Sequence, residues 1–414
     1  MSRGESSIMK LARLPLGPHL SAVSWFFIET FFLVTIFFLP FSKSVGEGAL
    51  LVCLALWLLR KFPWDEAFPF VPICNLSYLV FLVAVLLSFT HIPKEDLATG
   101  VQGFLKWLKY LGVFFMSVDL FKNEGRTKRF VFVFLVSMTL VCANGFYQLW
   151  TGVDLIKHYA VDIPGRFIRM KSSFGSPNGL AAFLAMAIPI GFFVWFKKNR
   201  WSPASVLLAL MLILFGVSFI LTLSRAALLG LFISVGAVVL VSQKKRVLIP
   251  VLLSPLLLLA SKTLRDNFFA SLSLKDITIA ERFRFWETTL RMIKDHPWLG
   301  NGVNTYYLKF GAFAPAEETY RGYAHNCYLQ MWGEVGILGL LAFMTPLLVI
   351  LIKDLFGPRS AKQGLDLKDV LFVGLGAFLV QSFFDTNFYA LQASILFWIF
   401  WGMYNSASAI KFRH

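Results

Sequence analysis

The sequence predicts an all-α integral membrane protein with about 12 transmembrane helices. Hydrophobic residues make up 57% of its 414 residues and charged residues 15%, whereas a soluble domain has roughly 25% charged residues. Apolar stretches long enough to cross a bilayer recur along the whole chain, and inside lipid a helix satisfies its own backbone hydrogen bonds. We therefore expect one polytopic membrane domain over residues 1–414.

Prolines and clusters of cations mark several ends of the expected spans. Pro40 ends the first span and Pro177 opens the sixth, while runs of lysine and arginine follow the sixth and the eighth. No cleaved signal is expected before the first span, which is long and soon followed by another. The expected spans are 22–40, 45–60, 69–90, 101–121, 130–150, 177–196, 203–223, 224–242, 247–262, 326–352, 369–388 and 390–408.

The distribution of lysine and arginine predicts the orientation in the membrane. If both termini lie in the cytoplasm, every short inner loop carries at least two of these residues, as the positive-inside rule requires. The net charge of +16 is then mainly a signal of topology, and we expect membrane lipids but no nucleic acid as partners. The four cysteines show no metal-ligand spacing, and no metal site is expected.

Two outer segments are longer than a simple connection: a smaller periplasmic loop over 151–176 and a large one over 263–325. The large loop is basic, although it lies on the face that the positive-inside rule keeps poor in cations. Within it, residues 281–296 place Phe283, Trp286 and Leu290 at roughly helical spacing before Pro297. This pattern predicts an amphipathic helix that lies along the membrane interface.

Several motifs follow one another from residue 178 onward. In order along the chain they contain Asn178, Arg225 with Leu229, Arg282 with Trp286, His296 to Gly302, and His325 with Asn326, Gly336 and Gly339. These motifs resemble those of the O-antigen ligase and polymerase superfamily, whose ligase pattern is a histidine followed by Asn, nine residues, Gly, two residues and Gly, with a short Arg-x-x-x-Leu motif before it.

The resemblance implies a membrane-embedded glycosyltransferase with a GT-C-like fold. Such an enzyme transfers a glycan from an undecaprenyl-diphosphate carrier onto a lipid A–core hydroxyl at the periplasmic face of the inner membrane. The resemblance also implies an inverting reaction that needs neither a metal nor another cofactor. Two alternatives stay open: a polymerase of the same superfamily, and a lipid or solute transporter, against which stands the lack of an internal repeat.

The chemistry assigns roles to the residues in these motifs. Arginine grips phosphate oxygens with two parallel hydrogen bonds, so Arg225 and Arg282, with Arg284 as the alternative to Arg282, are expected to bind the donor diphosphate. A neutral histidine accepts a proton near neutral pH, so His325 is the candidate catalytic base. Arg225 as an interfacial cation and His325 as a structural residue are the simpler readings. Further possible substrate-binding residues are Asn178, Arg166, Arg169, Asn326 and Arg321.

Charged residues inside the expected spans are functional candidates because charge is costly in lipid. They are Glu29, Lys106, Lys109 and Asp385. The two lysines share a helix face and are expected either to line a path for the lipid diphosphate or to pair with Glu29 or Asp385. On a regular helix starting at His325, the motif glycines share the histidine's face and Glu334 lies opposite.

Overall fold

The computed structural model describes residues 18–61, 67–161, 169–198, 202–242, 262, 277–315, 322–357 and 365–406. Within these ranges helices predominate, and a helix lies in each expected span except 247–262, of which only residue 262 is described. Arg166 and Arg321 lie outside the described residues. The helices are α2 Pro18–Phe38, α3 Lys43–Lys61, α4 Pro72–Leu87, α5 Leu97–Leu120, α6 Glu124–Thr151, α7 Pro177–Phe196, α8 Pro203–Leu221, α9 Arg225–Ser242, α12 Ile277–Asp295, α13 Tyr306–Phe313, α14 Cys327–Phe356, α15 Leu367–Gln381 and α16 Leu391–Ser406, with short 3₁₀ turns at Ser88–His91 and Lys94–Asp96.

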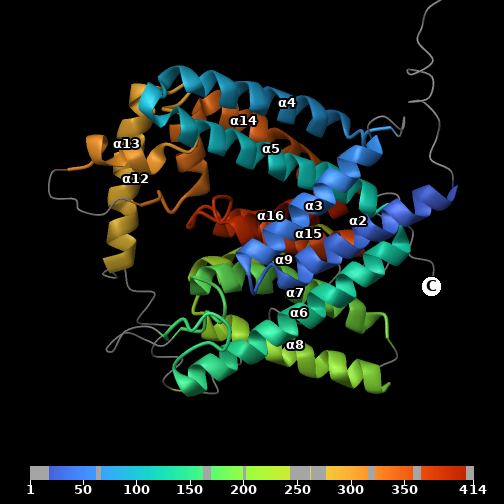
Figure 1. Cartoon of the computed structure of the whole chain (residues 1–414). Coiled ribbons are helices and arrows are strands. Elements are labelled where there is room, and N and C mark those ends of the chain that lie inside the picture. Colours follow the sequence, from blue (N-terminus) through green and yellow to red (C-terminus); the bar gives the residue numbers. More distant parts are fainter. Residues whose placement is uncertain are drawn as a thin grey trace, which may run out of the picture.

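Five helical segments of the described chain are long and apolar enough to cross a membrane. They are Pro72–His91, Glu124–Thr151, Pro177–Phe196, Pro203–Leu221 and Cys327–Phe356. Many of the helices lie roughly along one axis of the molecule, and α2, α3 and α6 are inclined to it (Figure 1). The chain is therefore an all-α membrane protein, as its composition predicts.

Three helices, α7, α15 and α16, form the centre of the bundle. Almost every side chain of α16 and most of those of α7 and α15 are buried, which agrees with helices that are apolar on all sides. α15 packs closely on α9 and α7, and α16 packs on α5. The outer helices α4, α6 and α8 bury a smaller share of their surface, so they face the lipid.

One end of the bundle is rich in paired cations. The carboxylate of Asp119 contacts the ammonium groups of Lys61 at 2.6 Å and Lys122 at 2.9 Å. Glu29 pairs there with Arg126 and Arg129. Glu29 is thus a structural ion-pair partner that joins α2 to α6, which offsets the cost of a charge near lipid.

The opposite end of the bundle is covered by α12 and α13. Figure 1 shows α12 running crosswise to α4, α5 and α14, past the ends of these helices. Its inner face contributes Phe285 and Met292 to a small second core with Tyr306, Phe310 and Ala324. The helix from Ile277 to Asp295 thus lies across the ends of the spans, as an interfacial helix does.

The helix expected over 369–388 ends earlier than the hydropathy suggested. α15 stops at Gln381, and residues 382–390 form a turn before α16. The polar run Asp385, Thr386 and Asn387 explains this end, because short polar side chains bond to nearby backbone groups in competition with the helix. Asp385 is therefore a turn residue at the end of the bundle and not a charge within a span.

Candidate active site

His325 lies just before α14 and not on it. Its backbone has a left-handed φ of 49°, and the next residue, Asn326, begins the helix as its N-cap. The side-chain oxygen of Asn326 accepts hydrogen bonds from the amides of Tyr328 and Leu329, both at 3.0 Å. Asn326 is 1% exposed, so this side chain holds the start of α14 beside the histidine.

Asp385 is the charged partner of His325. The Nδ1 atom of His325 lies 3.6 Å from Oδ1 of Asp385, an ion-pair distance that is longer than a hydrogen bond. Nδ1 is buried while the side chain as a whole is 33% exposed. The exposed part of the ring therefore lies away from Nδ1 and from Asp385.

The surroundings of Asp385 keep it ionised. Burial raises the pKa of this carboxyl, but His325, the amide of Thr386 and the side chain of Asn178 lower it, and the net result is a pKa below the usual value. The Thr386 amide donates to Oδ1 at 2.8 Å. A carboxylate held in this way orients an imidazole and stabilises its protonated form.

Asn178 and Arg169 connect Asp385 to neighbouring segments of the bundle. The guanidinium of Arg169 donates to the side-chain oxygen of Asn178 at 3.1 Å and to the carbonyl of Thr222 at 2.8 Å. The Gln381 amide donates to the Asn178 carbonyl at 2.9 Å. The chain of contacts Arg169, Asn178, Asp385 and His325 thus joins the 169–176 segment, the start of α7 and the end of α15.

Arg225 begins α9 on the same side of the molecule. α9 crosses α15 closely: a methyl group on Gly230 would lie 2.5 Å from the carbonyl oxygen of Ala377, and one on Gly376 would lie 2.5 Å from the hydroxyl of Ser234. This order is antiparallel, so the start of α9 lies at the end of α15 that bears Gln381. Arg225, which is half-buried, is therefore placed at the same end as the Asp385 turn.

α12 brings Arg282 toward His325 and turns Arg284 away. The ring of Phe285 stacks on the imidazole of His325 with centroids 6.0 Å apart, and the ring of Trp286 contacts Phe383 at 5.6 Å. At 100° per residue, Arg282 falls between Phe285 and Trp286 on the helical wheel, whereas Arg284 lies on the other side. Arg282 is half-buried and Arg284 is exposed.

The Gly336 position of the histidine motif is a break in α14. Gly336 has φ 72° and ψ 176°, a conformation that is essentially restricted to glycine. A methyl group there would lie 2.0 Å from the carbonyl oxygen of Trp298. The expectation of a regular helix below His325 is therefore wrong, because the backbone of the 297–299 segment occupies the gap.

The backbone of residues 296–302 forms hydrogen bonds with α14 on both sides of this break. The amides of Asn301 and Gly302 donate to the carbonyls of Gly333 and Glu334 at 2.8 and 2.9 Å, and the amide of Ile337 donates to the Pro297 carbonyl at 3.0 Å. These bonds satisfy helix groups that the break would otherwise leave unpaired. The histidine motif and the His296–Gly302 motif thus form one structural unit that holds α12 over the bundle.

Substituting Gly336 tests this unit. We expect Gly336→Ala to reduce the folded yield and the thermal stability of the purified protein, because the alanine adds about 1–3 kcal/mol of backbone strain to the clash with Trp298. Gly333→Ala is the matched control, since the nearest atom to its methyl group is 3.7 Å away. Equal melting temperatures for the two variants would contradict the role of Gly336, and thermal unfolding followed by circular dichroism measures them.

Lys106 and Lys109 have partners that the sequence did not predict. The ammonium of Lys106 donates to the side-chain oxygen of Asn304 at 2.9 Å, and Lys109 pairs with Glu47 of α3. Glu334 accepts from the Asn304 amide at 3.0 Å. The expected pairing of these lysines with Glu29 or Asp385 is wrong, because the fold brings Asn304 to Lys106 and Glu47 to Lys109.

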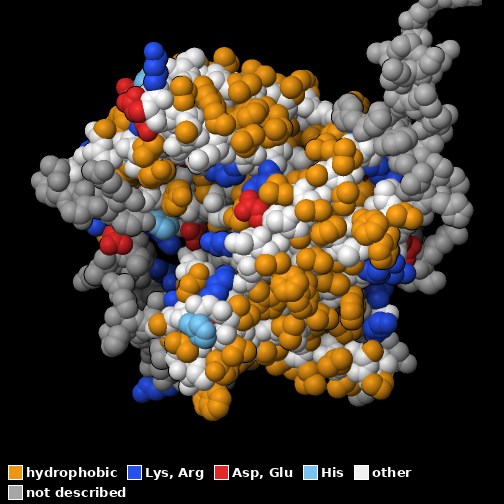
Figure 2. All heavy atoms as spheres, in the orientation of Figure 1, with side chains coloured by type: hydrophobic (Ala, Val, Ile, Leu, Met, Phe, Trp, Pro, Cys, Tyr) orange, Lys and Arg blue, Asp and Glu red, His pale blue; other side chains and the backbone are white. Residues whose placement is uncertain are grey.

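A hollow lined by charge opens on the face drawn in Figure 2. Lysine, arginine, acidic and histidine side chains gather there between two bands of apolar surface. In the segment that follows α6, Lys157 lies near Lys43, and its pKa is lowered by burial and by that like charge. The ammonium groups of Lys157 and Lys171 lie 5.5 and 6.0 Å from the ring of Tyr159. Such a cluster of cations suits an anionic substrate.

Residues 210–344, about a third of the chain, match the family model of the O-antigen ligase. The match supports membership of the O-antigen ligase superfamily. No curated protein matches it. The matched O-antigen ligase segment contains Arg225, Arg282 and His325, whereas Asp385 and Asn178 lie outside it.

The site therefore joins residues of the family segment to Asn178, which lies upstream of it, and to Asp385, which no motif marks. The sequence singled out Asp385 as a charge of unknown role, and its place in the chain held no sign of a contact with His325. Among the described residues, no three His, Cys, Asp or Glu side chains are grouped as a metal site requires. Arg166 and Arg321, the remaining predicted site residues, lie outside the described residues.

Proposed function

We propose that the chain is an O-antigen ligase that transfers a glycan from undecaprenyl diphosphate onto a hydroxyl of lipid A–core. In this proposal the His325 end of the bundle faces the periplasm, the cation-rich end faces the cytoplasm, and the spans form a GT-C-like fold in the inner membrane. The observation that carries the proposal is the contact between His325 and Asp385, beside α9 and α12, which bear Arg225 and Arg282.

The reaction follows from the placement of these side chains. Nε2 of His325 accepts the proton of the acceptor hydroxyl, and the oxygen attacks the anomeric carbon of the donor sugar. The bond from that carbon to the diphosphate oxygen breaks on the opposite side, so the configuration inverts and the electron pair leaves with the diphosphate. Asp385 stabilises the imidazolium that forms.

The arginines act on the leaving group. Negative charge grows on the diphosphate as the glycosidic bond breaks, and a guanidinium that is already in place stabilises it in the transition state. Arg225 approaches from the bundle and Arg282 from the crosswise helix, so the diphosphate would lie between them. This two-sided arrangement favours Arg282 over Arg284 as the second ligand, and it needs no metal to neutralise the diphosphate.

A lipopolysaccharide gel of a deletion strain tests the proposed activity. We expect the strain to lose all O-antigen from its lipid A–core while carrier-linked polymer accumulates, and a plasmid copy to restore both. A core that carries one repeat unit would instead identify a polymerase, which cuts the same bond with a different acceptor. An unchanged lipopolysaccharide profile would contradict the ligase.

A further inference from the structure

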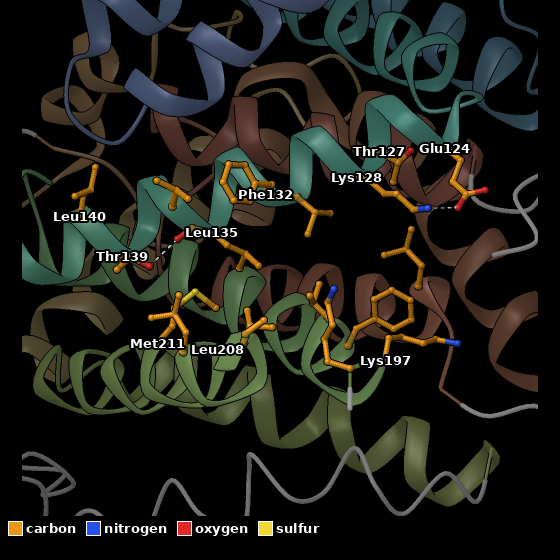
Figure 3. A pocket seen from close by; sticks show the side chains of 18 residues that line it. Glu124, Thr127, Lys128, Phe132, Leu135, Thr139, Leu140, Lys197, Leu208 and Met211 are labelled. Carbon is orange, nitrogen blue, oxygen red and sulfur yellow. Dashed lines mark hydrogen bonds and ion pairs between the residues drawn. The ribbon is translucent and has the colours of Figure 1, made fainter. Parts of the chain in front are cut away.

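A large apolar groove lies between α6, α7 and α8, far from His325. It has a volume of about 1000 Å³, which is at the upper end for small-molecule sites. Figure 3 shows Phe132 and Leu135 of α6 facing Leu208 and Met211 of α8 across it. The walls are therefore hydrocarbon over most of the groove.

Charge is confined to one end of this groove. Figure 3 shows Glu124, Lys128 and Lys197 at that end and Thr139 and Leu140 toward the other end. Lys198, which follows Lys197 in the chain, also lines the groove. All four charged residues belong to the cation-rich end of the bundle. From Lys128 to Leu140 the helix α6 rises about 18 Å, which is more than half of a hydrocarbon core of roughly 30 Å.

Two of the lysines are available to a ligand. Lys128 pairs with Glu124 at 2.8 Å, so these two charges compensate each other. Among the residues that the structure describes, no carboxylate lies within ion-pair distance of Lys197 or Lys198, and the ammonium of Lys197 sits 5.8 Å from the ring of Phe193. The groove thus presents two uncompensated positive charges at the head-group level of an apolar trench.

We propose that this groove binds an anionic glycerophospholipid, with its phosphate at Lys197 and Lys198 and its acyl chains along α6 and α8. Charge complementarity and the length of the trench select this occupant. The donor lipid does not fit, because its diphosphate has to reach His325 at the opposite end of the bundle. The site is separate from the proposed transfer reaction, and a binding measurement tests it without any assay of transfer.

Native mass spectrometry of the full-length protein in detergent provides the test. We expect the wild type to retain phosphatidylglycerol more strongly than phosphatidylcholine. Removing both charges in Lys197→Gln/Lys198→Gln should weaken phosphatidylglycerol binding about 30-fold, since one lysine near an anionic head group contributes about a factor of five, and should leave phosphatidylcholine binding unchanged. Lys353→Gln is the matched control, because Lys353 is exposed at the same end on α14 and does not line the groove.

A second variant tests the trench without changing charge. Leu208→Trp should reduce the retention of both lipids, while Leu341→Trp, on an exposed position of α14, should not. The proposal is overturned if wild-type protein holds the two lipids equally, if the double glutamine variant binds as the wild type does, or if undecaprenyl phosphate displaces phosphatidylglycerol. It is also overturned if Leu208→Trp leaves both lipids bound, because the acyl chains then lie elsewhere.

Discussion

His325→Ala is expected to reduce glycan transfer by about 10²–10⁴-fold, because that is the usual contribution of a positioned general base. Binding of the lipid-diphosphate donor should stay nearly unchanged, since the arginines hold the diphosphate. Transfer by purified protein and donor binding by the same sample measure the two effects. His158→Ala is the matched control, because this histidine is exposed in the segment that follows α6 and has no role in the proposed proton transfer.

The pH dependence of transfer provides a second measurement of the same role. The pKa of Asp385 lies below the usual value, so this carboxylate stays ionised from about pH 5 to 8. A general base has to be unprotonated to accept the acceptor proton, so we expect transfer to slow toward acid in this range. Asp385→Asn should lower the rate, because a neutral neighbour stabilises the imidazolium less than a carboxylate does. A wild-type transfer rate in His325→Ala, or a flat wild-type profile with chemistry limiting, returns His325 to a structural role.

Arg225→Ala and Arg282→Ala are each expected to lower transfer by about 10²–10³-fold, the usual cost of removing one donor to a developing negative charge. Donor affinity should fall as well, because the same guanidinium contacts the diphosphate before the bond breaks. Lysine at either position should restore little activity, since it loses the two parallel hydrogen bonds. Transfer and donor binding by equal amounts of folded protein measure the effect.

Two arginines of α12 serve as controls for the arginine variants. Arg284 is exposed, and Arg291 pairs with Glu287 on the exposed side of the helix at 2.6 Å, so Ala at either position should change transfer little. A large loss at Arg284 with wild-type activity in Arg282→Ala would mean that the other face of α12 binds the diphosphate. Full activity in Arg225→Lys and Arg282→Lys would mean that only the charge matters at these positions.

The class of protein, most of the helices and the order of the motifs could be predicted from the sequence alone. Apolar stretches and prolines influence the backbone conformation over one or two helical turns. The start of α7 at Pro177 and the start of α9 at Arg225 could therefore be predicted from neighbouring residues. The resemblance at His325 and Arg225 pointed to the O-antigen ligase superfamily, which the matched segment 210–344 confirms. These are local properties of the chain, and one sequence is enough to determine them.

The contacts between these residues depend on how distant helices pack in the folded chain. Asp385 reaches His325 because α15 ends at Gln381 and packs against α9 and α7, and no local pattern records packing between helices far apart in the sequence. The break at Gly336 depends in the same way on the distant 296–302 segment, whose backbone bonds replace those of the helix. A charged residue within a membrane span predicts that a partner exists. The identity of that partner depends on which helix packs beside it, and for Lys109 the partner is Glu47 of α3.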